Sequence, residues 1–297
     1  MHLSTDDDTV TERLRARLFG IAYRMLGHAQ DAEDVVQDAL LRWHATDRRA
    51  VNSAEAWLVA VTSRLAIDRL RRATTERALY DGPWLPEPIA TVDRRPTDRD
   101  AELASDLSMA FLVLLERLAP EERAAFLLRD VFDTDYGEIA RILTKEAGAV
   151  RQMVHRARER VRRGRTRFEA SADASARLLR RFLAALEADD ADELLAVFDA
   201  SATFTSDGGG KVSAMRNVVR GAEAVTKALL GYERKGRGLM THRIATVNGD
   251  SAILTFVGER LAFATFLDGD DTRLTAVYRL LNPDKLGHLG ETLFEWP

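Results

Sequence analysis

The sequence predicts a multidomain protein in which two all-α domains, the second with a helix-turn-helix, precede an α+β domain. Apolar residues recur at helical spacing as far as about residue 168. Four of the seven prolines, at positions 83, 86, 88 and 96, interrupt this pattern. Beyond residue 200, β-branched and aromatic residues form short strand-like runs. The expected divisions are a first helical domain over 1–73, a proline-rich linker over 74–100, a second helical domain over 101–168 and the α+β domain over 169–297.

Composition narrows the class of protein. The formal net charge is −4 and the pI is near 5.9, but basic residues concentrate at 64–72 and 151–167. The absence of cysteine excludes disulfides and thiolate chemistry and fits a reducing cytoplasm. The first ten residues are acidic and lack an apolar core, so no signal peptide is expected. The longest apolar run, Met109 to Leu115, is too short to span a bilayer, and we expect a cytoplasmic protein without membrane contact.

Two helices open the first domain. The pattern predicts one from about Thr11 to Leu26, which ends at Gly27. The next, over 31–43, has apolar residues on one face and three acids on the opposite face, Asp31, Asp34 and Asp38. Acids near a helix N-terminus favour the helix dipole, but this does not explain the last of the three, two turns in. Contact with a basic partner is therefore slightly favoured.

A third helix, over 53–72, ends in a basic run and follows a basic loop. Its inward face is predicted to hold Leu58, Val61 and Leu65. Trp43 and Trp57 flank the loop and could support unstacked bases, by roughly 1–3 kcal/mol each. Tryptophans at such positions more often belong to the core, and we expect that both mainly pack. The basic and amide residues of the loop and helix are Arg48, Arg49, Asn52, Arg64, Arg69, Arg71 and Arg72.

The proline-rich linker cannot continue a helix, and a stiff polyproline spacer is its plain interpretation. It contains Trp84 and Leu85, however, which are costly to leave in water. We therefore expect these two side chains to dock on another part of the protein. After the linker, an amphipathic helix is predicted from Ala101 to Leu118, and Pro120 suits the first turn of the next helix.

Two short helices joined by a tight polar turn are predicted between Asp135 and Arg163. The second helix has an apolar stripe at spacings of four, three and four, formed by Val150, Val154, Ala157 and Val161. A neighbouring stripe keeps the same spacing and is basic, formed by Arg151, His155, Arg158 and Arg162. One side of the helix should pack, and the other is suited to phosphate and bases.

A solvated basic helix in an ordinary bundle is the main alternative for this arginine-rich helix. Between Arg151 and Arg167 there are eight arginines and a single acid, Glu159, so pairing within the helix cannot neutralise them. This density favours contact with a polyanion.

The C-terminal domain is predicted to begin with a helix from Ser171 and a short helix near 191–198. Five strand-like runs follow, and we expect them to form a curved antiparallel sheet. The runs are ATFTS, HRIATVNG, SAILTFVG, LAFATFLD and RLTAVYRLL. The string DGGGK, at 207–211, has only fragments of a phosphate-binding loop and is better explained as a wide turn.

Four segments within about 11–165 resemble, in the same order, bacterial RNA polymerase sigma factors of the extracytoplasmic-function (ECF) type. They are AYRMLGHAQDAEDVVQDALLRW, AWLVAVTSRLAIDRLRR, LAPEERAAFLLRDVFDTDYGEIARIL and VRQMVHRARERVRR. The resemblance implies that Asp31, Asp34 and Asp38 bind core RNA polymerase. It also implies that the loop at 46–52 and the helix to Arg72 read and melt a downstream promoter element. An upstream element would be read through Arg151, Gln152, His155, Arg156 and Arg158.

The sequence departs from this family at two places. Arg64 stands where many such factors have asparagine, in the helix that melts the promoter. Thr144 occupies a turn position that is often glycine, which predicts a strained turn.

The C-terminal part, over about 175–297, resembles the SnoaL-like branch of the nuclear-transport-factor-two-like fold, an α+β cone. Three strings, WLPEP, DGGGK and NPDKL, resemble the hallmarks of the SigJ-like ECF factors, whose fused SnoaL-like tail regulates the factor in cis. The implied regulatory residues are Trp84, Leu85, Pro86, Glu87, Pro88, Asp207, Gly208, Gly209, Gly210, Lys211, Asn282, Pro283, Asp284, Lys285 and Leu286.

Other functions remain open for the tail and the chain. SnoaL-like cones often enclose a cavity, so the tail could be a small-molecule sensor or an acid–base enzyme, with Asp207, His242 and Asp250 as candidates. His242 is better explained as a satisfied surface histidine, and we expect no catalytic residue. The six histidines show no metal-ligand spacing, so no metal or other cofactor is expected. A plain helix-turn-helix repressor would leave the acidic helix without a purpose.

Overall fold

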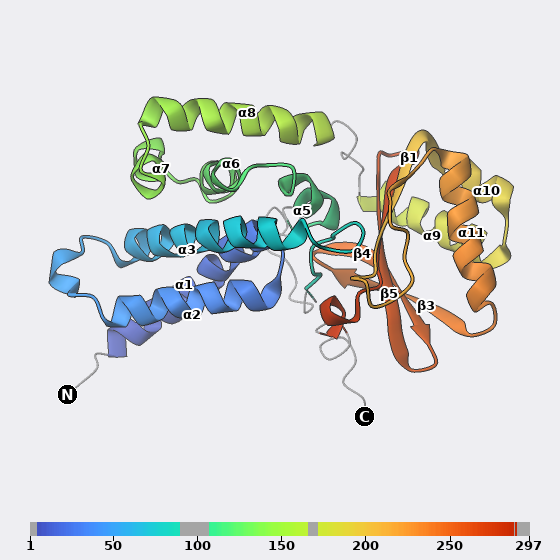
Figure 1. The fold of residues 1–297 in the computed structure, drawn as a ribbon, viewed down its shortest axis with the longest axis horizontal. Coiled ribbons are helices and arrows are strands. Elements are labelled where there is room, and N and C mark those ends of the chain that lie inside the picture. The colour runs from blue at the N-terminus through green and yellow to red at the C-terminus, as the bar shows by residue number, and fades with distance from the viewer. Residues whose placement is uncertain (1–4, 90–106, 166–171, 288, 290–297) are drawn as a thin grey trace. The chain divides into compact units, whose positions relative to one another are not determined.

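The computed structural model describes residues 5–89, 107–165, 172–287 and 289 (Figure 1). The chain forms two compact units, and both are discontinuous in sequence. Unit 1 comprises Met1–Ala78 and Leu114–Arg162, and unit 2 comprises Leu79–Val113 and Arg163–Pro297. The described part of the linker from Leu79 onward therefore folds with the C-terminal residues. Within the described ranges, no helix combines the length and apolar character that a membrane span needs.

The first part of unit 1 is a group of three helices with a short 3-10 turn before the third. They are α1 (Thr5–Leu26), α2 (Ala29–His44), η1 (Arg48–Ala50) and α3 (Ala54–Arg77). Gly27 ends α1 with a φ of 64°, as the sequence predicted. In α3, Leu58 is fully buried, whereas the predicted core residues Val61 and Leu65 are only half-buried. The buried face of α3 is instead completed by Val59, Ala66, Ile67, Leu70 and Ala73.

The second part of unit 1 is reached through α5 (Met109–Leu115). It then contains α6 (Pro120–Phe126), the π-helical turn η2 (Leu127–Val131), α7 (Tyr136–Leu143) and α8 (Ala147–Arg165). The long helix predicted from Ala101 to Leu118 is wrong over its described part, because α5 is shorter at both ends. Ser108 accepts a hydrogen bond from the backbone N–H of Phe111 at 3.2 Å and starts the helix. Residues 101–106 lie outside the described part of the chain.

The two helices of the predicted helix-turn-helix are α7 and α8. The Asp135 carboxylate caps α7 by accepting from the Gly137 N–H at 2.7 Å. Thr144 has φ 54° and ψ 50°, so this β-branched residue adopts the left-handed conformation, which agrees with the strain expected at this turn. The predicted apolar stripe of α8 is confirmed, since all four members are buried: Val150, Val154, Ala157 and Val161.

Unit 2 is an α+β domain with a six-stranded sheet in the order β2-β1-β6-β5-β4-β3. Its helices are α9 (Ala172–Ala188), α10 (Ala191–Ala196), α11 (Ala222–Gly236) and the 3-10 turn η3 (Pro283–Lys285). Its strands are β1 (Phe198–Asp207), β2 (Val219–Arg220), β3 (Met240–Val247), β4 (Asp250–Val257), β5 (Arg260–Gly269) and β6 (Leu274–Leu280).

Two predictions for this domain are wrong. The sheet is mixed, because β1 pairs with β6 in parallel, with Phe204 opposite Val277. A parallel pair needs a long crossover, which here contains α11 and four other strands. The sequence analysis did not identify α11, although its buried Val225, Leu229 and Leu230 have helical spacing.

The two faces of this sheet are covered by different parts of unit 2. Helices α9, α10 and α11 lie on one side (Figure 1), where Phe182, Phe198 and Phe204 belong to one buried cluster. The second cluster lies on the other face, where Leu85 of the linker and Met109 of α5 pack with strand residues. Both described ends of the chain segment that connects the two parts of unit 1 are therefore anchored on the C-terminal domain.

Candidate functional site

The predicted polymerase-binding acids lie along α2, but their surroundings differ. Asp34 and Asp38 are exposed. Asp31 is only 19% exposed and accepts two hydrogen bonds from Arg69, from Nε at 3.1 Å and from Nη2 at 2.9 Å. The pair neutralises both partners, so Asp34 and Asp38 are the acids that remain accessible to a basic partner. Contact with polymerase stays a prediction for all three.

The basic loop before α3 is supported by the two tryptophans that flank it. Trp43 is 3% exposed, and its ring lies 5.3 Å from that of Trp57, which confirms that Trp43 mainly packs. The Arg48 guanidinium lies over the Trp43 ring at 5.4 Å. The Asp47 carboxylate accepts from the Arg49 N–H at 3.1 Å and shapes the loop. Asn52 is exposed.

The basic residues of α3 do not form one free surface. Arg69 pairs with Asp31, as described above, and Arg71 donates to Glu121 of α6 at 2.6 Å. Arg64 donates to two backbone carbonyl groups of α7. Arg72 is exposed. The sequence analysis treated these arginines as one DNA-facing group. It could not predict their hydrogen-bond acceptors within the protein, because these lie up to 78 residues away in the chain.

The predicted reading face of α8 is exposed, at Arg151, Gln152, His155, Arg156 and Arg158. Two arginines of α8 have acidic partners on other elements, which the sequence analysis did not consider. Arg158 donates to both oxygens of Asp130, which raises the pKa of the guanidinium, and Arg160 donates to Glu122. These acids come from α6 and η2, so they could not be found by inspecting α8 alone. Arg167 lies outside the described residues.

Asp207 is the centre of a buried contact that joins the three hallmark strings within unit 2. This carboxylate is completely buried and accepts from the Leu85 N–H at 2.9 Å and from the Tyr80 hydroxyl at 2.6 Å. It also accepts from Lys285 Nζ at 2.8 Å and from the Gly209 N–H at 3.0 Å. A buried carboxylate is stable only with such partners, so the linker fold depends on it.

Lys285 completes this linker interface. Its ammonium is 5% exposed and donates to the Leu85 carbonyl at 2.7 Å as well as to Asp207. It also lies over the Trp84 ring at 4.1 Å and the Tyr80 ring at 5.0 Å. The expectation that Trp84 and Leu85 dock is confirmed, and Pro86, Glu87 and Pro88 are buried beside them.

The glycine string provides space for this interface. Gly209 has a φ of 61°, and a Cβ there would lie 2.4 Å from Nδ2 of Asn282, so no larger residue fits. The Asn282 amide in turn donates to the Tyr80 hydroxyl at 2.9 Å. Lys211 and Asp284 form an exposed ion pair at 2.6 Å. Gly208, Gly210, Pro283 and Leu286 complete the two strings that the sequence analysis singled out.

Two contacts of the linker were not predicted. Tyr80 is the first, and burial together with its hydrogen bond to Asp207 raises the pKa of its phenol. The second is an exchange of hydrogen bonds in which Asn248 Oδ1 accepts from the Ile89 N–H at 2.7 Å and the Ile89 carbonyl accepts from the Asn248 N–H at 3.0 Å. Asn248 sits in an Asn-Gly hairpin turn, which gave no reason to expect a buried partner.

The three candidate acids and bases of the tail do not converge. Asp207 is on β1 and His242 is on β3, and three strands separate them, which corresponds to about 19 Å. His242 is only 6% exposed, so it is not a surface residue, but it is satisfied by Thr255 at 2.9 Å and Glu233 at 3.4 Å. Asp250 starts β4 at the hairpin turn. No arrangement of these three supports general acid–base chemistry.

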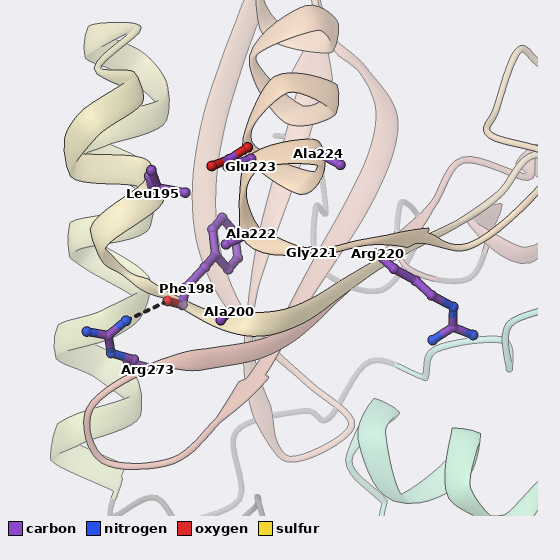
Figure 2. Close-up of a pocket in the computed structure, with 9 residues that line it drawn as sticks. All are labelled: Leu195, Phe198, Ala200, Arg220, Gly221, Ala222, Glu223, Ala224 and Arg273. Atoms are coloured by element: carbon purple, nitrogen blue, oxygen red, sulfur yellow. Dashed lines mark hydrogen bonds between the residues drawn. The ribbon is translucent and has the colours of Figure 1, made fainter.

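A pocket of about 490 Å³ lies at the N-terminal end of α11 (Figure 2). Phe198 lies at its centre, and Arg220 and Arg273 extend on opposite sides of it. Arg273 donates to the Phe198 carbonyl at 3.1 Å. None of the predicted site residues lines this pocket.

Comparison with known proteins gives two family matches. Residues 10–76 match Sigma-70 region 2, and residues 108–161 match Sigma-70, region 4. The chain is 36% identical over 288 residues to the ECF RNA polymerase sigma factor SigJ of Mycobacterium tuberculosis strain H37Rv, covering 92% of this chain and 91% of that protein.

Two further similarities cover almost the whole chain. The probable ECF RNA polymerase sigma factor SigI of M. tuberculosis strain CDC 1551 is 31% identical, over 93% of each protein. The crystal structure of M. tuberculosis SigJ superimposes with a TM-score of 0.77 at 32% identity, and the match covers 96% of this chain and 99% of that one. The similarity includes the C-terminal domain.

Proposed function

The chain belongs to the ECF RNA polymerase sigma factors, and we propose that it directs core RNA polymerase to a bipartite promoter and helps to open it. The exposed face of α8 carries this proposal. Five basic or amide side chains on one helix face are suited to the major groove, where they would meet phosphates and base edges. Regions 2 and 4 of the family correspond to the two parts of unit 1.

The polymerase contact is assigned to α2. Asp34 and Asp38 are exposed on it and have no basic neighbour among the ion pairs of the described residues. Asp31 would join them only if Arg69 moved away. The assignment is supported by charge and position, since an exposed acidic helix face has no evident role in the fold of unit 1.

The downstream promoter element is assigned to the loop at 46–52 and to α3. Arg49 and Asn52 are exposed in this loop, and Arg48 is half-buried over the Trp43 ring. Basic side chains there would hold the backbone of a melted strand, and the partly exposed Trp57 offers a ring face to a base. No catalysis is needed for this step.

The C-terminal domain is proposed to regulate the sigma regions in cis through the linker. When the linker is docked on this domain, the free tether between regions 2 and 4 is shorter. The effective concentration of one DNA-reading region near the other falls by about threefold each time the length of the free tether doubles. Loosening the linker interface should therefore weaken recognition of the bipartite promoter.

We propose that the tail acts without catalysis, metal or other cofactor. Its candidate acids and bases are separated, and a sensor or acid–base enzyme is not favoured. As a sigma factor the protein would act in the cytoplasm, where core polymerase and promoter DNA are found.

Transcription in vitro with purified core polymerase tests whether the chain acts as a sigma factor. A promoter for this assay can be selected from random-sequence DNA by the complex of core polymerase with the whole chain.

Capture of the chain by core polymerase tests the assignment of the polymerase contact to α2. Asp34→Lys should abolish capture by core polymerase, because it places a cation in an acidic docking surface. Asp192→Lys, an exposed acid on α10, is the matched control and should leave capture unchanged. Equal capture by both variants would discard the assignment of α2.

The DNA assignment is tested by two arginines of α8. Arg151→Ala should weaken binding to the upstream element selectively, by roughly 1–3 kcal/mol if Arg151 reads a guanine. Arg163→Ala should weaken binding to any duplex and lower the salt slope by roughly one unit. Equal losses on all sequences at both positions would show that the reading face is assigned wrongly.

A further inference from the structure

Tyr136 contacts side chains of η2 and α8 from the start of α7. It is the first residue of α7, where the Asp135 carboxylate fixes the backbone by accepting from the Gly137 N–H at 2.7 Å. The buried face of α7 is formed by three other residues, Ile139, Ala140 and Ile142. Tyr136 is only half-buried and lies outside this face, so its ring can contact other elements.

Three arginines gather around this phenol. The guanidinium of Arg129, in η2, lies 4.9 Å from the centre of the ring, and that of Arg151, in α8, lies 5.5 Å from it. Arg158, two turns further along α8, binds both oxygens of Asp130 and also the Tyr136 hydroxyl, and these hydrogen bonds raise the pKa of its guanidinium. A cation over an aromatic face is attracted by the ring quadrupole, so the ring helps to hold these groups in place.

The three arginines differ in whether their charge is already neutralised. Arg129 pairs with Asp133 at 3.2 Å, and Arg158 pairs with the acid of η2 named above. Arg151 is exposed and forms no ion pair with any of the described residues. Of the three, Arg151 therefore has the guanidinium that is most available to a base or a phosphate, and the Tyr136 ring is the group that confines it.

We propose that Tyr136 is a positioning residue, which presets the direction of Arg151 and thereby the base preference at the upstream element. The proposal rests on the assignment of the reading face of α8 to that element. An exposed arginine populates many rotamers, and ordering it on binding costs free energy. A ring that already confines the guanidinium removes part of this cost for one direction of the side chain. It therefore favours the base whose acceptors lie in that direction.

A contact with a ring face suits this role because it uses no hydrogen-bond donor. The N–H groups of Arg151 stay available while its guanidinium lies over Tyr136. Two of them can then meet the O6 and N7 acceptors of a guanine, as arginine does in the major groove. Arg158, in contrast, uses two of its donors on Asp130 and connects α8 to η2. It should contribute less to base preference than Arg151.

DNA binding by the complex of core polymerase with the whole chain tests the proposal. The base pair read by Arg151 is the one whose preference is lost in Arg151→Ala, and the selected element is compared with a version changed at that pair. Tyr136→Leu removes the ring and should lower the ratio of the two dissociation constants by about two- to fivefold. Tyr136→Phe keeps the ring without the hydroxyl, and its ratio should stay within about 1.5-fold of the wild-type value.

A double-mutant cycle shows whether the effect passes through Arg151. In Tyr136→Leu/Arg151→Ala the ratio should be no lower than in Arg151→Ala alone, because the ring has no guanidinium left to position. The matched control is Arg156→Ala, at an exposed residue of the same helix that makes no contact with Tyr136 within the described part of the chain. Its fold-loss and that of Tyr136→Leu should multiply. Losses that multiply for both arginines would overturn the proposal.

Salt dependence separates positioning from a general loss of structure. Tyr136→Leu should leave the salt slope of duplex binding unchanged, since it removes no phosphate contact. A slope lower by about one unit, or equal losses on all duplexes, would overturn the proposal, because the ring would then support α8 as a whole. Equal losses on all duplexes in Tyr136→Phe would also overturn it, because the hydroxyl itself would then bind DNA.

Arg151→Ala separates this proposal from the proposed function. A selective loss in Arg151→Ala without one in Tyr136→Leu would overturn the positioning role alone. Absence of a selective loss in Arg151→Ala would overturn the assignment of the reading face, and the role of Tyr136 with it.

Discussion

The linker interface joins segments that are far apart in sequence, and so does the contact between regions 2 and 4, which we call the inter-region interface. This second interface is formed by Arg64, Arg71, Glu121 and Arg123. The two interfaces use charge differently. In unit 2, Lys285 and Asp207 are 5% and 0% exposed, and four further donors and acceptors and an apolar cluster surround them. In unit 1, Arg71 and Glu121 are 53% and 32% exposed. A buried pair is costly to break, whereas an exposed pair is worth little and responds to salt. The first interface is suited to permanent attachment and the second to opening.

The largest loss of stability is expected when the buried ion pair of the linker interface is broken. Lys285→Met leaves the Asp207 carboxylate buried without its cation, so the free energy of unfolding of unit 2 should fall by about 3–5 kcal/mol. Urea denaturation monitored through tryptophan fluorescence measures this loss. Lys211→Met breaks an exposed pair with Asp284 and should cost less than about 1 kcal/mol. Similar losses of unfolding free energy in both variants would contradict the difference between the buried and the exposed ion pair.

The stability of unit 2 should depend on pH. Burial, with the Asp250 carboxylate nearby, raises the pKa of Asp268 from 3.8 to about 8. The stability that protonated Asp268 contributes is complete below about pH 4 and is lost as the pH rises through about 8, by at most about 1.4 kcal/mol for each pH unit. Asp268→Asn should flatten this profile in denaturation curves measured between about pH 5 and 8. An unchanged slope would show that Asp268 is ionised in the fold.

A smaller effect is expected at the centre of the inter-region interface. Arg64→Met removes two hydrogen bonds to the end of α7 and should cost about 1 kcal/mol locally. Amide hydrogen exchange should then speed up over the last turn of α7 and the turn at Thr144. Arg72→Met, an exposed residue of the same helix, is the control. Equal protection in the two variants would mean that Arg64 does not hold region 4.

The smallest effect concerns salt. An increase from about 50 to 500 mM should weaken the rim of the inter-region interface by a few tenths of a kcal/mol and leave the buried Lys285–Asp207 pair unaffected. Hydrogen exchange in α6 and in the 80–89 segment reports on the two interfaces separately. Faster exchange in the linker segment at high salt would contradict the comparison.

Much of the fold could be predicted because local signals were strong. Helical spacing identified α1, α2, α3, α7 and α8. Strand-like runs identified β1, β3, β4, β5 and β6, which are five of the six strands in the described residues. The buried stripe of α8 followed from its pattern, and the strain at Thr144 followed from the turn position. The parallel pairing of β1 with β6 was not accessible, because it joins residues about 70 positions apart and no local pattern encodes its direction.

The candidate sites divide in the same way. Residue type and spacing singled out the acids of α2 and the basic face of α8, and the resemblance to a known family singled out the three hallmark strings. They did not reveal that Asp31 binds Arg69 or that Arg64 binds α7, since each partner lies on a distant element. Tyr80 and Asn248 were missed because an aromatic residue near a break and a hairpin asparagine have ordinary local explanations.

By itself, the sequence predicted most of the helices and strands and proposed residues that could bind polymerase and DNA, because these inferences depend on side-chain chemistry and short-range spacing. Only the tertiary structure decided which charged side chains form ion pairs within the fold and which remain exposed on the surface. The physical reason is that burial and neighbouring groups determine how much a charged side chain contributes to stability or to binding. Both depend on segments that meet only when the chain is folded.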